Sequence, residues 1–252
     1  MYTDTEGIIL KQIKILNNRR MISLFSRKFG KISAGTSISE KGRGKSALAM
    51  RPFTYGKYEL YKSRDSYHIN GAHVIKSYYK IGEDVEKYMY CSYVLEYTDK
   101  ILHEEAPAVE IFDLIIDFFA IMERRSKKYS SLILAYQLKS LQYLGCMPEI
   151  TCCTRCGSKE SVAGFSVKDG GLLCENCYIK VKENPNETLI YSLNSDIVDI
   201  LKYILQHPIK NLESLAIEER LLNQLKVIIK SYISVYLDIN NLKSESFLID
   251  NV

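Results

Sequence analysis

Two Cys-x-x-Cys pairs constrain this chain more than any other feature of its sequence. The first pair is Cys153 and Cys156, and the second is Cys174 and Cys177. Each pair places two thiolates on one tight turn, and the 17 residues between the pairs allow a hairpin, turning at Gly170-Gly171, to bring them together. Four thiolates favour zinc and fill its tetrahedral shell. We therefore expect one structural Zn²⁺ with no open position for a catalytic water.

Two alternatives stay open in this segment. Cys152 directly precedes Cys153 and permits a Cys-x₃-Cys register, although the spacing from Cys153 equals that of the second pair. The four cysteines could instead be a vestigial or redox dithiol set. In a reducing compartment, however, clustered cysteines are metal ligands more often than disulfides. The other two cysteines, Cys91 and Cys146, lie in apolar helical surroundings, where we expect small hydrophobic side chains.

The first 80 residues have the pattern of a small β-domain. Turn signals such as Asn17-Asn18 and Phe29-Gly30-Lys31 separate short β-rich runs. The expected strands are Thr5 to Ile15, Met21 to Phe25, Ile32 to Thr36, Phe53 to Tyr61 and Tyr67 to Tyr79. Five short strands with turns between them favour a closed or nearly closed barrel. A polar, Gly-rich stretch from Ser37 to Ser46 follows the third expected strand, and no helix with caps clearly follows it.

After Gly82 the apolar residues recur at helical spacing. The expected helices are Glu83 to Glu105, Pro107 to Arg125, Ser130 to Leu144, Asn194 to Gln206 and Glu218 to Leu237. The sequence thus predicts an α+β protein with a β-domain at 1–80 and a mostly helical domain at 81–252, which contains the inserted zinc segment at 150–180. No segment approaches a membrane span, and the first residues lack a signal peptide's basic start. We expect a soluble cytoplasmic protein without a membrane partner.

Charge is distributed unevenly along the chain. Residues 1–80 contain 16 Lys and Arg against 5 Asp and Glu, whereas residues 81–252 contain 18 against 25. The balances are therefore +11 and −7, and a basic first domain favours a polyanionic partner over a merely solvated basic surface. The candidate nucleic-acid contacts in its loops and strand ends are Arg19, Arg20, Arg27, Lys28, Lys31, Lys41, Arg43, Lys45 and Arg51.

Aromatic residues interleave with lysines in the fourth expected strand, at Phe53, Tyr55, Tyr58 and Tyr61. Strand alternation places some of these rings inside the barrel and some outside. An exposed ring can stack on a nucleic-acid base, although any single ring belongs more often to the core.

Catalytic patterns are poorly represented. Gly44-Lys45-Ser46 resembles the end of a phosphate-binding loop, but Ser39 stands where its first glycine belongs. The four histidines are dispersed, and the neighbouring Glu104 and Glu105 precede Pro107, where a solvated role is the default. We therefore expect no catalytic residues and a protein that is not an enzyme.

Five segments of the sequence, in order, resemble the bacterial DNA repair and recombination mediator family RecO. These segments are Thr5 to Lys11, Leu24 to Lys31, Lys45-Ser46 followed by Arg51-Pro52-Phe53, Leu141 to Pro148 leading into both cysteine pairs, and Leu242 to Leu248. The resemblance covers essentially the whole chain. One departure is that Thr36 to Glu40 is less basic than the corresponding loop of the family.

This resemblance implies an N-terminal five-stranded OB-fold barrel and a helical domain with zinc. It implies binding of single- and double-stranded DNA, annealing of complementary strands, and work with RecR to replace single-strand-binding protein with RecA on gapped DNA. The protein would then associate with the nucleoid. Two other classes stay possible from the residues alone, namely an RNA-binding zinc-ribbon protein of the translation or transcription machinery, and a zinc enzyme.

Overall fold

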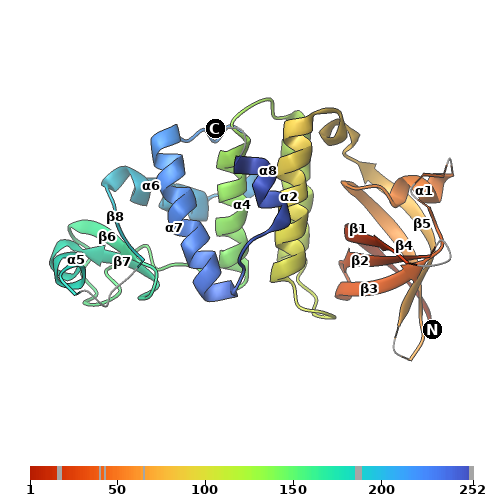
Figure 1. Ribbon diagram of the computed structural model, residues 1–252, viewed down its shortest axis with the longest axis horizontal. Coiled ribbons are helices and arrows are strands. Elements are labelled where there is room, and N and C mark those ends of the chain that lie inside the picture. Colours follow the sequence, from red (N-terminus) through yellow and green to blue (C-terminus); the bar gives the residue numbers. More distant parts are fainter. Residues whose placement is uncertain (16–18, 40, 43, 65, 185–188, 250–252) are drawn as a thin grey trace. The chain divides into compact units, whose positions relative to one another are not determined.

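The structure is a computed structural model that describes residues 1–15, 19–39, 41–42, 44–64, 66–184 and 189–249. The chain divides into two units (Figure 1). Unit 1 consists of Met1–Tyr129 together with Asn241–Val252, and unit 2 consists of Ser130–Asn240. The chain therefore leaves unit 1 and returns to it after completing unit 2.

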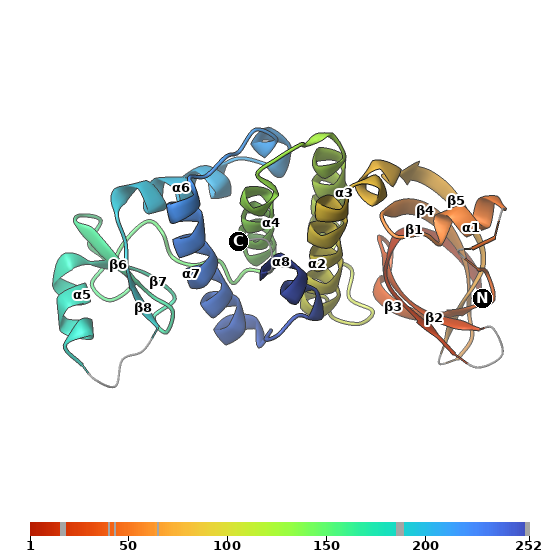
Figure 2. The ribbon, with the colours of Figure 1, turned by 45° about the horizontal axis from the view of Figure 1, so that its top comes forward.

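A five-stranded closed barrel begins unit 1, and Figure 2 shows its strands as a ring. The strands follow the order β1-β2-β3-β5-β4, which is the topology of an OB-fold. Their bounds are β1 Tyr2–Lys14, β2 Arg20–Ser26, β3 Gly30–Thr36, β4 Thr54–Lys62 and β5 Tyr67–Ser77. The expected α+β fold with an N-terminal barrel is thus confirmed.

Alternation along the strands fills the barrel with apolar side chains. A short helix, α1 (Lys45–Ala49), adds Ala49 and the following Met50 to this interior, and the Tyr58 hydroxyl donates a hydrogen bond to the Ala49 carbonyl at 2.8 Å. We did not expect a helix here, because Gly44 provides no side-chain cap and the helix is only 5 residues long. The buried core comprises Ile9, Ile22, Leu24, Ile32, Ala34, Ala49, Met50, Tyr58, Leu60, Tyr67, Ile69 and Ala72.

Two helices of unit 1 pack against the barrel. After a 3₁₀ turn η1 (Tyr79–Glu83), α2 spans Val85–Ile101 and α3 spans Val109–Arg124. The ring of Phe112 in α3 lies 5.2 Å from that of Phe25 in β2, and Phe119 lies 5.6 Å from Phe53. These buried rings form an aromatic contact between α3 and the barrel.

The connection between α2 and α3 approaches the barrel closely at Gly30. Gly30 has a φ of 71°, and a Cβ at this position would lie 2.0 Å from the carbonyl oxygen of Ala106. The adjacent Glu105 N–H donates to the Lys31 carbonyl at 2.8 Å. Only glycine suits both the backbone conformation and the contact.

The last described segment of unit 1 contains η3 (Lys243–Glu245) and α8 (Ser246–Ile249). The Glu96 carboxylate in α2 accepts hydrogen bonds from the N–H groups of Lys243 and Ser244, at 3.0 and 2.8 Å, and from the Ser244 hydroxyl at 2.6 Å. Although partial burial raises the pKa of Glu96, these hydrogen bonds lower it below its ordinary value.

Unit 2 combines helices with a small sheet of order β7-β6-β8. Its elements are α4 (Tyr129–Tyr143, which starts at the last residue of unit 1), β6 (Val162–Ser166), β7 (Gly171–Cys174), α5 (Glu175–Lys182), β8 (Ile190–Ser192), α6 (Ser195–Gln206), η2 (Ile209–Leu212) and α7 (Glu219–Leu237). The expected start of α6 is confirmed, because the Asn194 side chain accepts the Ile197 N–H at 3.1 Å. The sequence did not predict α5 or β8.

The structure also locates the acidic excess that the sequence showed after residue 80. Residues 81–129 carry 11 acidic and 6 basic residues, whereas residues 130–240 carry 12 and 11. Most of the imbalance therefore belongs to the part of unit 1 that contains α2 and α3, and unit 2 is almost neutral. The expected domain boundary near residue 80 stays a prediction.

Candidate nucleic-acid interface and metal centre

The four cysteines of the two pairs come together in unit 2. Their Sγ atoms all lie within 4.8 Å of one another, and those of Cys156 and Cys174 are 3.6 Å apart. Cys153 and Cys156 belong to the turn that precedes β6, whereas Cys174 ends β7 and Cys177 lies in α5. The expected hairpin between the pairs is present, because β6 and β7 pair up to Ser166 and Gly171.

Backbone hydrogen bonds fix the first cysteine turn. The Gly157 N–H donates to the Cys153 carbonyl at 2.8 Å, and Gly157 has a φ of 75°, which suits glycine. The Thr154 N–H donates to the Leu172 carbonyl at 2.9 Å and so attaches the turn to β7. Burial raises the pKa of the Cys153 thiol, but N–H groups of Cys174, Cys156 and Arg155 outweigh it and lower this pKa to about 6.

This donor set fits a tetrahedral metal ion. A bond of about 2.3 Å from zinc to each sulfur implies sulfur–sulfur distances of about 3.8 Å, close to the spacing of these thiols. Within the described part of the chain, these cysteines form the one cluster of three or more His, Cys, Asp or Glu side chains that could bind a metal ion. Cys152 is not part of the cluster, so the geometry favours Cys153 in the register that the sequence left open.

At least four of the nine candidate DNA contacts, among them Lys28, have side chains that already bind within unit 1. Arg20 is buried and donates to the Gln12 side chain at 3.0 Å. Arg27 pairs with Asp113 of α3 at 2.7 Å, and this hydrogen bond raises the pKa of Arg27. Lys31 donates to the Asp99 carbonyl at 2.8 Å. Counting Lys and Arg in the sequence therefore overestimates the positive charge that a ligand can contact, because some of these side chains already bind within the protein.

Other candidates lie at one end of the barrel. In the strand register Arg20 of β2 stands opposite Lys14 of β1 and Thr36 of β3, so the end of β1, the start of β2 and the end of β3 lie together. The Gln12 side chain reaches the Met50 carbonyl at 2.5 Å, so the residues after α1 lie at this end as well. The exposed candidate cations that adjoin these elements are Arg19, Lys41, Lys45 and Arg51.

Lys11 and Lys14 are exposed on β1 at the same end of the barrel, and our candidate set omitted them. With Ile13, Met21, Ser23, Lys31, Ser33, Asp99 and Glu104, Lys11 lines a hollow of about 180 Å³. The sequence could have identified both lysines, since Lys11 and Lys14 interrupt the apolar residues of the first expected strand. Arg43 lies outside the described residues, and Lys28 is exposed near the other end of β1, where its Nζ donates to Thr3 at 3.1 Å.

Acidic side chains of the barrel occupy a different surface. Asp4 and Glu6 of β1 and Glu59 of β4 all lie on the outer side of this strand pair, and Asp4 stands directly opposite Glu59. Lys57 pairs with Asp4, and His73 lies 3.4 Å from Glu59. The described acids of residues 1–80 are thus separated from the cations at the β1–β2 end.

The four aromatic residues of the β4 region divide between core and surface. Tyr58 is fully buried inside the barrel, and Phe53 is buried against α3. Tyr55 is half-buried and donates to Glu6 at 2.6 Å; burial and this hydrogen bond raise the pKa of Tyr55 to about 12. Tyr61 is the exposed member, as alternation allowed.

Comparison with known proteins supplies the family. The model of the N-terminal part of recombination protein O matches residues 1–78, and the model of its C-terminal part matches residues 82–246. The chain belongs to the RecO family. The first match covers the barrel and the second begins just before α2, so the RecO pattern extends over both units.

Curated RecO proteins resemble this chain over nearly its whole length. The DNA repair protein RecO of Alkaliphilus metalliredigens is 27% identical over 245 residues, which cover 97% of each chain. That of Caldanaerobacter subterraneus is 26% identical and covers 98% of this chain and 97% of the relative. That of Exiguobacterium sibiricum reaches 33% identity over 69% of this chain and 70% of the relative. The chain is accordingly a DNA repair protein of the RecO family.

No helix in the described part of the chain combines the length and the apolar character that crossing a bilayer requires.

Proposed function

We propose that this chain binds single- and double-stranded DNA through its barrel and brings complementary strands together. In this proposal it acts with RecR at the nucleoid, in the cytoplasm, to replace single-strand-binding protein with RecA on gapped DNA. It performs no covalent chemistry. Membership of a DNA repair family supports DNA over RNA as the ligand.

The separation of charge on the barrel carries this proposal. Exposed cations adjoin the β1–β2 and β3–α1 connections, whereas Asp4, Glu6 and Glu59 lie on the outer side of the β1–β4 pair. Cations at one end of a barrel can neutralise phosphates and release counterions, and the same neutralisation reduces repulsion between two strands. Strands that no longer repel each other can meet and pair.

The candidate cations differ in how freely they can serve this role. We rank Arg19, Lys41 and Lys45 first because they are exposed. Arg20, Arg27 and Lys31 rank lower, since a phosphate would have to compete with their present partners.

We further propose that Cys153, Cys156, Cys174 and Cys177 bind one structural Zn²⁺. The metal would complete its shell with four thiolates and would contribute stability rather than reactivity. The spacing of the thiols and the N–H donors to Cys153 support this assignment.

Salt-dependent DNA binding tests the first proposal. The full chain is titrated with single-stranded DNA over a range of salt concentrations, and the variant Arg19→Glu with Lys41→Glu and Lys45→Glu is compared with it. Each lost phosphate contact reduces the slope of log K against log salt by about 0.7. We expect a reduction of roughly 2 for the triple variant, together with weaker binding.

The matched control reverses three cations elsewhere, by Lys127→Glu, Lys159→Glu and Lys180→Glu; these residues are equally exposed. An unchanged slope in the first variant would exclude its three cations as DNA contacts. Tighter binding of structured RNA than of single-stranded DNA, measured by competition, would contradict DNA as the ligand.

A further inference from the structure

Two tyrosines form an exposed aromatic pair on the outer surface of the barrel. Tyr2 of β1 stands directly opposite Tyr61 of β4, and their ring centroids are 5.1 Å apart with the planes at 50°. The residues are 77% and 37% exposed. Tyrosines whose rings contact each other and remain partly in water, Tyr2 more than Tyr61, offer an apolar face to a ligand.

Cationic and acidic side chains both lie near this pair. The Lys28 ammonium donates to the hydroxyl of Thr3, the residue after Tyr2, and Arg64 is exposed in the turn between β4 and β5, three residues after Tyr61. Lys62, which directly follows Tyr61, already contacts the Tyr67 hydroxyl at 2.7 Å and the Glu105 carboxylate at 3.4 Å. Asp4 and Glu59 are the next opposed residues on the outer face that carries the tyrosines, so these acids lie along the strands and Arg64 lies beyond the pair, at the strand end.

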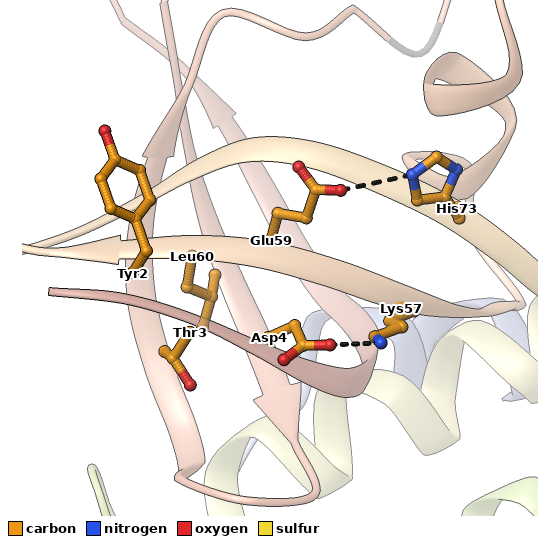
Figure 3. A pocket seen from close by; sticks show the side chains of 7 residues that line it. All are labelled: Tyr2, Thr3, Asp4, Lys57, Glu59, Leu60 and His73. Carbon is orange, nitrogen blue, oxygen red and sulfur yellow. Dashed lines mark ion pairs between the residues drawn. The ribbon is translucent and has the colours of Figure 1, made fainter.

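A hollow of about 610 Å³ extends from Tyr2 along the strands, lined also by Thr3, Asp4, Lys57, Glu59, Leu60 and His73 (Figure 3). Tyr2 stands clear of the strands at one end, whereas the contacts of Asp4 with Lys57 and of Glu59 with His73 lie along the hollow. Because Lys57 already balances Asp4, the hollow is less negative than its carboxylates suggest.

We propose that Tyr2 and Tyr61 form a stacking platform for a base of single-stranded DNA, with Lys28 and Arg64 near it for the flanking phosphates. This inference rests on the proposed DNA-binding function and adds a second place on the barrel where a strand is held. A base is flat and carries no charge, so it can stack on the rings beside the ion-paired hollow, while the phosphates meet Lys28 and Arg64.

Binding to normal and abasic strands tests this platform. The probes are oligothymidylate of roughly 20 nucleotides, longer than the site of one OB-fold, and an abasic strand of equal length and charge. For Tyr2→Leu with Tyr61→Leu we expect roughly tenfold weaker binding of oligothymidylate, the loss of one stacked base. Affinity for the abasic strand and the salt slope stay unchanged, because no phosphate contact is removed.

Two controls separate stacking from other causes. Tyr79→Leu removes a tyrosine that is 61% exposed elsewhere in unit 1, and it leaves oligothymidylate binding unchanged. Tyr2→Phe with Tyr61→Phe retains the rings and retains the affinity. The single change Tyr2→Leu, at the more exposed ring, measurably weakens binding of oligothymidylate. The thermal unfolding of this variant matches that of the parent chain, so the weaker binding is not caused by misfolding.

Three results would overturn the inference. Equal losses on both strands would point to a structural role or to a docked peptide, and so would a loss in the phenylalanine variant. If the double leucine variant binds with full affinity while the parent chain binds with the expected salt slope, the platform is refuted and the proposed function is not. Failure of the parent chain to bind single-stranded DNA would instead overturn the proposed function itself.

Discussion

The barrel of unit 1 and the cysteine segment of unit 2 hold their strands together by different means. The barrel is a closed ring, and 12 buried side chains, all of them apolar or aromatic, fill its interior in the described part of the chain. The core of the cysteine segment consists of Cys153, Leu173, Cys174 and Val181, so half of its buried members are candidate metal ligands. A cluster this small does not stabilise a fold by hydrophobic burial alone.

The difference teaches where each region obtains its stability. Unit 1 adds two packed helices to an already filled barrel, whereas the sheet of unit 2 packs against the cysteine cluster and α7. The ring of Phe165 in β6 lies 6.0 Å from that of Tyr232 in α7, and the Tyr191 hydroxyl is 2.8 Å from that of Ser231. We therefore expect the two regions to respond to different perturbations.

The largest effect is expected from Cys174→Ser. The variant loses a thiolate ligand, and structural zinc contributes on the order of 10 kcal/mol to folding in small metal-dependent modules. We expect loss of the bound metal and fast hydrogen exchange throughout residues 150–184, with DNA binding by the barrel retained. Metal content and exchange by mass spectrometry measure this.

Cys152→Ser is the matched control, because this cysteine is half-buried beside Cys153 but lies outside the cluster. It keeps both the metal and the exchange protection. If Cys174→Ser kept its metal instead, the ligand assignment would be wrong and the comparison between the two regions would fail.

The second prediction concerns the seam between barrel and helices. Gly30→Ala forces a methyl group against the Ala106 carbonyl and strains a positive φ, so unit 1 should lose roughly 2–4 kcal/mol of stability. Denaturant unfolding measures the change. Gly82→Ala, where a Cβ meets nothing within 4 Å and φ is not in the left-handed range, should be nearly neutral. Equal effects of the two changes would show that the barrel does not need this close contact.

The third and smallest effect belongs to Glu96→Gln, which we expect to cost about 1 kcal/mol. Because the pKa of Glu96 is lowered in the folded protein, its contribution is fully present above the ordinary carboxyl pKa and is lost as pH falls through the lowered value. Hydrogen exchange of residues 241–249 should therefore be faster in the variant at neutral pH. Parent and variant should converge in acid, and a difference that persists there would refute an ionic role for Glu96.

The sequence predicted most of the barrel because strand alternation and turn residues act locally. All five expected strands are present, with ends shifted by a few residues, since Arg20 and Lys62 extend their strands by pairing with neighbours. The long helices were equally visible from their apolar spacing. α1 was missed because burial of Ala49 and Met50 in the barrel, rather than helix propensity, keeps it folded.

The candidate site was predictable only in part. The cysteine spacing identified the cluster because a tetrahedral shell dictates it. Charge counting could not show that Arg27 donates a hydrogen bond to Asp113 and Lys31 donates one to the Asp99 carbonyl, since these contacts join residues about 70 or more positions apart. Likewise, the Tyr2–Tyr61 pair depends on the β1–β4 register, which closure of the barrel sets.

The return of residues 241–249 to α2 has a consequence for synthesis. The Glu96 carboxylate cannot find Ser244 until the ribosome has produced the chain as far as that residue. The barrel can close early during translation, and the intervening residues of unit 2 can fold next, but residues 241–249 join unit 1 after both. A nascent chain stalled before Ser244 would leave the surface of α2 around Glu96 uncovered.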